Sequence, residues 1–313
     1  MAEPVVVVIP TRDRPAMLAE ALASVIAQDD PAWVAVVADD GAGPPVADDP
    51  RLPRDPRVHH VRTAAGTAGG ARNAAVVHAE LRVLRGPAAL IAFLDDDDLW
   101  RPDHLRAARR ALAVVPDATI CHAAAMTRGP DGAEAPYHAR GEGPRAGDVF
   151  GALLARDVVT TSSAVVRGAA FTAVGRFRED LAHGEDWDLW LRLAARGPAA
   201  FVDAPTAVHR EHGGNVSRAL AAKARDQATV LSSWWRQRHL LRPVDRRTLR
   251  ATLVRLHRRH VRRLLADGRA SRPEVVAVAG AAWREIPAFG TARARVEARL
   301  GRRGVGAGQA SAS

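Results

Sequence analysis

The segment ALIAFLDDDD, residues 89–98, decides the fold. Its continuous apolar part predicts a strand buried on both faces, as in the parallel sheets of α/β proteins. The four aspartates that follow repel one another unless a positive charge neutralises them. Carboxylate oxygens suit Mg²⁺ or Mn²⁺, which bind proteins through one or two carboxylates plus substrate phosphates. The alternative interpretation is a solvated acidic turn before a helix that starts after Pro102.

Around this segment, short β-branched runs alternate with helical patterns, which favours an α/β domain with a largely parallel, Rossmann-like sheet. We predict strands at residues 5–9, 33–38, 57–62 and 89–94. A helix from Pro15, with an apolar stripe at i, i+4, i+7 and i+8, and a helix over residues 68–84 connect them. Ligands collect beyond the carboxyl ends of such strands. Thr11, Asp39 and the aspartate run all fall there.

Downstream, we predict a helix to about residue 114 and a strand at 118–123. A mobile Gly/Pro-rich loop follows at 128–147, then a mixed α/β part to residue 212 and helices from 217 to about 300. The expected domain organisation is a catalytic domain over residues 1–230, a basic helical extension over 231–300 and a disordered tail over 301–313.

The composition is typical of a folded protein. The chain has 313 residues, of which 47% are hydrophobic and 26% charged, and this is enough apolar content for a sizeable core. Cys121 is the only cysteine, which excludes an internal disulfide and a thiolate metal site. The N-terminus lacks a basic signal region, and no apolar stretch approaches the roughly 20 residues that span a bilayer. We therefore expect a cytoplasmic protein. Peripheral association with the inner face of the membrane is the alternative.

The net charge of +10 is uneven, because residues 231–300 hold 17 arginines and no lysine, for a local charge of +12. Leu249, Leu253, Leu256, His260 and Leu264 fall at helical spacing among these arginines. One function class that this suggests is a nucleic-acid or anionic-surface binding protein. It explains the C-terminus alone, and one tyrosine and six phenylalanines leave few base-stacking platforms. We favour docking to an anionic membrane surface or a partner enzyme, and expect no nucleic acid partner.

Two further clusters lie at predicted strand and helix ends. Asp39-Asp40-Gly41 suits an ordinary turn, or an aspartate that accepts a hydrogen bond from a nucleotide base. Arg72 lies just inside a helix start after two glycines, where it is either an exposed surface arginine or a phosphate ligand.

The segment Gly184-Glu185-Asp186-Trp187-Asp188 opens another predicted helix, where acidic residues complement the helix dipole. Helical phase puts Asp186 on the inward apolar face, and Glu185 and Asp188 on the other side. An inward carboxylate without a basic neighbour is a candidate general base. Beyond it, His212 precedes a glycine turn and could reach a metal that carboxylates already hold.

Taken in order over about residues 4–230, these pieces resemble the inverting family 2 glycosyltransferases. The matching pieces are Val8-Ile9-Pro10-Thr11, Asp39-Asp40-Gly41, Ala71-Arg72-Asn73, residues 93–98, Gly184-Glu185-Asp186 and residues 212–217. The resemblance implies a GT-A type Rossmann-like nucleotide-diphospho-sugar transferase fold, here with a C-terminal helical extension. Many members have an aromatic residue after Pro-Thr. This chain has Arg12, so stacking on the base would rely on a guanidinium group.

The resemblance also implies roles for individual residues. Those expected to bind the nucleotide sugar are Pro10, Thr11, Arg12, Asp39, Arg72, Asp95 and Asp96. Asp97 is the expected direct ligand of Mn²⁺ or Mg²⁺, with Asp95 and Asp97 as the ends of the D-x-D element. The four consecutive aspartates leave the register of this element open by one residue. His212 is expected to help hold the metal and diphosphate. Asp186 matches the general base, and Thr161, Ser162 and Glu185 are acceptor-side positions. Asp98 is left to the following turn.

The implied reaction is a direct displacement in which Asp186 deprotonates an acceptor hydroxyl and a metal neutralises the departing diphosphate. The expected donor is a UDP-, dTDP- or GDP-sugar, and the acceptor is a glycan, a lipid-linked molecule or a small molecule. A sugar nucleotidyltransferase is the alternative enzyme. The lack of a glycine-rich triphosphate loop near Thr11 counts against it.

Overall fold

The computed structural model describes residues 3–137, 145–212 and 220–267. It divides into two compact units, residues 1–216 and residues 217–313. The expected domain boundaries at residues 230 and 300 stay predictions. The expected tail over residues 301–313 lies outside the described residues.

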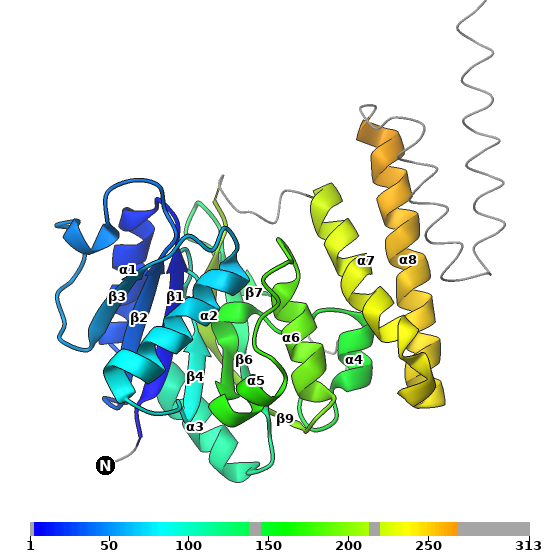
Figure 1. The fold of residues 1–313 in the computed structure, drawn as a ribbon, viewed down its shortest axis with the longest axis horizontal. Coiled ribbons are helices and arrows are strands. Elements are labelled where there is room, and N and C mark those ends of the chain that lie inside the picture. Colours follow the sequence, from blue (N-terminus) through cyan, green and yellow to red (C-terminus); the bar gives the residue numbers. More distant parts are fainter. Residues whose placement is uncertain (1–2, 138–144, 213–219, 268–313) are drawn as a thin grey trace, which may run out of the picture. The chain divides into compact units, whose positions relative to one another are not determined.

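The first unit is built on a mixed sheet, which among its described residues has nine strands (Figure 1). Its parallel half has the order β3 (Val58–Arg62), β2 (Trp33–Asp39), β1 (Val5–Thr11) and β4 (Leu90–Phe93). The order then continues with β8 (Ala164–Arg167), β6 (Ile120–Arg128), β9 (Ala199–Arg210) and β5 (Leu99–Trp100). In this second half only β6 and β9 pair in parallel. The predicted parallel arrangement is confirmed for the first four strands.

Helices connect and cover these strands. In the first unit they are α1 (Pro15–Ile26), α2 (Ala68–His78), α3 (His104–Val114), α4 (Phe150–Ala155), α5 (Gly168–Ala173) and α6 (Glu185–Ala194). A π-helical turn, Ala79–Leu84, extends α2, and short 3₁₀ turns cover Val46–Asp48 and Thr161–Ser163. The helices predicted from Pro15 and over residues 68–84 are confirmed.

The core follows directly from the apolar patterns. Residues 5–9 of β1 are at most 1% exposed, because β1 lies between β2 and β4 and is covered on both faces. Leu18, Leu22 and Val25 of α1 are buried in the same core, and Ile26 packs against it. Pro15 stands in the first turn of α1, where its missing N–H costs nothing.

The stretch at residues 128–147 differs from the expected mobile loop. Glu134–Pro136 form β7, which pairs antiparallel with the end of β6. Gly132 adopts a φ of +81° in the connecting turn, a conformation that favours glycine. The prediction is therefore wrong for residues 128–136, which form a hairpin. Residues 138–144 lie outside the described part of the chain.

The second unit contains α7 (Leu220–Arg236), the 3₁₀ turn Arg238–Leu240 and α8 (Pro243–Asp267). The two helices pack as a hairpin (Figure 1). Leu249, Leu253 and Leu256 are buried, as their helical spacing predicted. The side chains of His260 and Leu264 lie outside the description. Nowhere in the described residues is there a helix both long enough and apolar enough to cross a bilayer.

The imidazole of His104 predicts a pH-dependent stability. His104 is 1% exposed, stacks on Trp100 at 4.4 Å and shares a 2.8 Å hydrogen bond with Thr206. Burial lowers its pKa to about 3, whereas the unfolded chain keeps about 6.5. Below pH 6.5 the unfolded state therefore binds a proton that the folded state does not, so stability falls as the pH falls.

We expect this loss to disappear in His104→Gln. Between pH 7 and pH 5, wild type should lose up to about 2 kcal/mol of unfolding free energy more than the variant, at 1.36 kcal/mol per pKa unit. Urea unfolding at both pH values measures the difference, and the exposed His239→Gln serves as a matched control. Equal losses in wild type and His104→Gln would contradict the prediction.

Candidate active site

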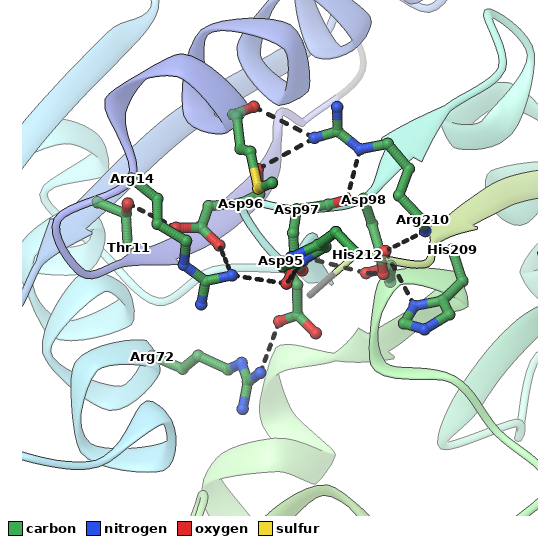
Figure 2. A network of polar contacts seen from close by, with 12 residues as sticks. Thr11, Arg14, Arg72, Asp95, Asp96, Asp97, Asp98, His209, Arg210 and His212 are labelled. Carbon is green, nitrogen blue, oxygen red and sulfur yellow. Dashed lines mark hydrogen bonds and ion pairs between the residues drawn. The ribbon is translucent and has the colours of Figure 1, made fainter. Parts of the chain in front are cut away.

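The four aspartates form a tight turn at the carboxyl end of β4, in which Asp98 N donates to Asp95 O at 3.0 Å. We call residues 95–98 the aspartate turn. The chain then enters β5, which pairs antiparallel with β9 and sets Leu99 opposite Val208. This pairing brings the end of β9 and the residues after it beside the turn, as Figure 2 shows for His209, Arg210 and His212.

Asp98 is the most firmly held member of the turn. Its carboxylate accepts hydrogen bonds from Ser162 Oγ at 2.6 Å, His209 Nδ1 at 3.0 Å and Arg210 N at 3.1 Å. Burial alone would lower the pKa of His209, but the hydrogen bond to Asp98 and the negative charges of Asp98, Asp97 and Asp95 together outweigh burial and raise it. Asp98 thus ties the aspartate turn to the 3₁₀ turn before β8 and to β9, so it does more than belong to the following turn.

Asp96 and Asp97 are held by the last residue of β1 and by the residue directly before α1. Thr11 Oγ1 donates to Asp96 at 2.7 Å, and Arg14 Nη1 lies 3.4 Å from Asp96 and 2.6 Å from Asp97. Burial raises the pKa of Asp96 to about 6 in spite of both partners.

Asp97 has a second partner in His212, whose Nε2 lies 3.0 Å from the same carboxylate oxygen that contacts Arg14. Burial raises the pKa of Asp97, but the hydrogen bonds from His212 and Arg14 outweigh burial and lower it. The structure therefore brings together Asp97 and His212, the two residues predicted as metal ligands, although they lie 115 residues apart.

Asp95 is joined to α6 through Arg72 of α2. Arg72 is 3% exposed, and its two terminal nitrogens lie 2.7 Å from Asp95 and 2.7 Å from Glu185. Burial lowers the pKa of the guanidinium group, but the two carboxylates outweigh it and raise the pKa. The surface-arginine alternative is wrong. Arg72 is a buried cation between two acidic elements, and its Nε makes no hydrogen bond within the described structure.

The predicted phase of α6 is wrong. Glu185 and Asp188 are 7% and 2% exposed, whereas Asp186 is only partly buried. Basic residues on either side accommodate the buried pair: Arg72 binds Glu185, and Arg192 binds Asp188 at 2.7 Å. The helix is thus buried around most of its circumference. A prediction from the spacing of apolar residues assumes one buried face and could not foresee this.

Asp186 is positioned by the 3₁₀ turn before β8. Thr161 Oγ1 donates to Asp186 Oδ2 at 2.9 Å, and Trp187 N donates to Oδ1 at 2.7 Å. Ser162, the next residue, instead accepts from Asp95 N at 3.1 Å and donates to Asp98. One short turn therefore links the aspartate turn to Asp186.

Asp39 lies at the same sheet edge, in register with Thr11 across β1 and β2. Its carboxylate accepts from Arg62 Nη1 at 2.7 Å and from the backbone N–H groups of Gly41 and Val46, each at 3.1 Å. These bonds shape the loop after β2. Of the other predicted positions, Pro10 is partly buried in β1 and Arg12 is exposed.

A cavity of about 410 Å³ adjoins Thr160, the residue before Thr161. Thr160 Oγ1 is buried and has no hydrogen-bond partner among the described residues. The other lining residues come mainly from β6, the β7 region and β9: His122, Ala123, Ala124, Ala125, Met126, Pro136, Arg145, Val158, Phe201, Asp203 and Pro205.

The donor set of the aspartate turn fits a hard divalent cation. Asp95, Asp97 and Asp98 each offer one carboxylate oxygen, and these three oxygens lie within 4.8 Å of one another. Oxygen ligands are those that Mg²⁺ and Mn²⁺ prefer, and the nearby His212 adds an imidazole nitrogen that Mn²⁺ accepts.

Sequence reasoning missed two basic residues of this site, Arg14 and Arg210. Arg14 precedes Pro15 without belonging to any recognised pattern. Arg210 Nε donates to Asp97 O at 2.5 Å, and its Nη1 pairs with Glu20 of α1. The pairing of β5 with β9 brings Arg210 to the turn, and nothing local in the sequence predicts that pairing.

Comparison with known families gives two matches along the chain. The model described as "Glycosyl transferase family 2" matches residues 6–151, and the one described as "Glycosyl transferase family group 2" matches residues 90–266. Among curated proteins, the succinoglycan biosynthesis protein ExoW of Rhizobium meliloti is 36% identical over 108 residues, 34% of this chain. The match spans only 32% of the length of ExoW.

Solved structures match the fold over nearly the whole chain. S. aureus TarS 1–349 in complex with UDP-GlcNAc has a TM-score of 0.66 at 16% identity, covering 94% of this chain and 83% of that one. The mannosyltransferase PcManGT from Pyrobaculum calidifontis, in complex with GDP-Man and Mn²⁺, has a TM-score of 0.56 at 19% identity, covering 95% and 85%. The expected GT-A type fold is confirmed.

The buried Arg72 bridge predicts a large stability loss on Arg72→Met. Removing the guanidinium group leaves Asp95 and Glu185 without their cation, and breaking a buried pair this way costs about 3–5 kcal/mol. Arg106→Met is the matched control, because its partner Asp29 is exposed and such pairs contribute about 0–1 kcal/mol. Urea unfolding measures both variants. A similar small loss in the two would contradict the buried-bridge interpretation.

Proposed function

This chain belongs to the family 2 glycosyltransferases, and we propose that it transfers a sugar from a nucleoside-diphosphate sugar to an acceptor hydroxyl with inversion at the anomeric carbon. The observation that carries the proposal is the aspartate turn, whose three convergent carboxylates lie one short turn away from Asp186. Hydrogen bonds from the adjacent residues Thr161 and Ser162 thereby connect the candidate base to a site for a metal ion and a diphosphate.

The nucleotide would lie at the carboxyl edge of the parallel strands. We assign Pro10, Thr11 and Asp39 to its base and ribose side, since Thr11 and Asp39 are neighbours in register at this edge. Arg12 is exposed and free to stack on a base. A UDP-, dTDP- or GDP-sugar suits this assignment, and the similar solved structures hold UDP-GlcNAc and GDP-Man.

Asp97, with Asp95, Asp98 and His212, would hold Mn²⁺ or Mg²⁺. When bound, the ion supplies positive charge that stabilises the departing diphosphate. Asp96 has a different task, because Thr11 and Arg14 engage its buried carboxylate and fix the turn to the first strand. Arg14 and Arg72 add fixed positive charge beside the turn, where a diphosphate needs it.

Asp186 would take the proton from the acceptor hydroxyl. Its carboxylate is partly exposed, so an acceptor has access, and the hydrogen bond from Thr161 fixes its orientation.

The acceptor would approach past the cavity beside Thr160. The buried Thr160 hydroxyl has no hydrogen-bond partner among the described residues, and the cavity lining is mixed. Both suit a polyhydroxylated molecule that also has apolar parts. We propose Thr161 as an acceptor-side residue. Ser162 and Glu185 would act through the aspartate turn and Arg72.

Nucleotide binding should depend on the metal and on Asp97. In a thermal-shift panel of UDP, dTDP and GDP with Mn²⁺, we expect one nucleotide at about 100 times its Kd to raise the Tm by roughly 5–10 °C. Asp97→Asn should lose the Mn²⁺-dependent part of this shift. Asp29→Asn, an exposed change at the opposite strand ends, should keep it. A panel without any shift, or full retention in Asp97→Asn, would argue against the site.

Asp186→Asn should separate catalysis from binding. We expect transfer to fall by about 10²–10⁴-fold, the usual contribution of a general base, while the nucleotide-dependent Tm shift stays as in wild type. Thr161→Val should reduce transfer less, because the carboxylate remains. Release of free nucleoside diphosphate is the assay, and pyrophosphate as product would instead indicate a nucleotidyltransferase. Unchanged transfer in Asp186→Asn would exclude it as the base.

A further inference from the structure

The corner between α7 and α8 combines exposed apolar and basic side chains. We define the helix corner as residues 235–250. Five large hydrophobic residues are exposed in the described structure, and two of them, Leu240 and Val244, belong to this corner at 72% and 51% exposure. Exposed apolar side chains are unremarkable singly, but a pair four residues apart at the tip of a helical hairpin is a defined local feature.

Exposed arginines flank Leu240 and Val244 within the helix corner. Arg236 precedes these two residues at the end of α7, and Arg246, Arg247 and Arg250 follow them on α8. Among the described residues none of these four has an acidic partner. The one acid of the corner, Asp245, is 3% exposed and accepts from Arg242 at 2.6 Å. The corner therefore presents uncompensated positive charge.

Within residues 249–259 of α8, whose side chains the structure describes, the leucines face inward. Leu249, Leu253 and Leu256 are buried, and α8 packs on α7. Binding by insertion of a whole amphipathic helix would require that packing to open. Leu240 and Val244 are the large hydrophobic residues that the described part of the second unit exposes, so they can enter an apolar phase while the hairpin stays folded.

These features favour a lipid surface over a nucleic acid. Arginines alone would suit any polyphosphate, but an exposed leucine and valine between them gain nothing from a phosphate backbone. The aromatic ring of the corner, Trp235, already carries Arg238 at 4.9 Å from its centroid. Apolar side chains that enter the acyl boundary, flanked by cations that meet anionic headgroups, match the chemistry of a bilayer interface.

We propose that the helix corner docks this protein on an anionic lipid bilayer, with Leu240 and Val244 inserted and Arg236, Arg246, Arg247 and Arg250 on the headgroups. The binding is peripheral and reversible, and it depends on ionic strength because its electrostatic part is screened by salt. It does not depend on the proposed catalytic site.

The test is flotation of the full chain with vesicles of phosphatidylcholine containing about 30% phosphatidylglycerol, at low and high salt. Replacing the four arginines by glutamine should weaken binding at least about 100-fold, since each basic residue near an anionic surface contributes about fivefold. Leu240→Ser/Val244→Ser should weaken it roughly tenfold. Pure phosphatidylcholine vesicles should bind poorly.

Matched controls separate the corner from general charge and hydrophobicity. Glutamine at the exposed Arg54, Arg82, Arg85 and Arg110 lowers the net charge equally. Leu81→Ser/Val114→Ser removes a leucine of similar exposure and a valine that is more exposed than Val244. Both should bind vesicles like wild type, and all variants should keep the wild-type Tm.

Two results would overturn the proposal. One is vesicle binding that is absent, or that the corner variants leave unchanged. The other is binding that needs the four arginines but not Leu240 and Val244, together with equal binding to duplex DNA. That pattern would identify a general polyanion site.

Discussion

Four adjacent carboxylates in one tight turn are the constraint on which the rest of this structure depends. Each carboxylate needs a positive or hydrogen-bonding partner, and those partners come from distant elements. Arg72 on α2 serves Asp95, Arg14 before α1 serves Asp97, and His209 on β9 serves Asp98. Removing the turn would leave these cations without their acids. The same convergence at the end of β4 gives the site its electrostatic character.

The sequence was sufficient to predict the elements whose side chains follow one clear period. The buried strands β1 and β4 and the stripe of α1 lie where the pattern placed them, because burial on a sheet or helix face imposes that pattern. The motif resemblance predicted Asp97 and His212 at one site, and the structure brings them together. The catalytic roles of the predicted site residues stay predictions.

Other parts depended on long-range packing that no local pattern records. The prediction of which face of α6 is buried was wrong, because Arg72, 113 residues away, pairs with Glu185 and so accommodates it as a buried residue. Asp98 could not be told from its three identical neighbours until the pairing of β5 with β9 brought His209 to it. The hairpin of β6 and β7 was hidden in a Gly/Pro-rich stretch, because short strands at a sheet edge need little apolar content.

The most direct test of the aspartate turn as a metal-diphosphate site is a Mn²⁺ titration followed by electron paramagnetic resonance, with and without the nucleoside diphosphate. The account predicts one Mn²⁺ per chain, bound more tightly when the nucleotide is present, since the two ligands must strengthen each other equally. Asp97→Asn should lose this Mn²⁺. Mn²⁺ binding that ignores the nucleotide, or that survives unchanged in Asp97→Asn, would contradict it.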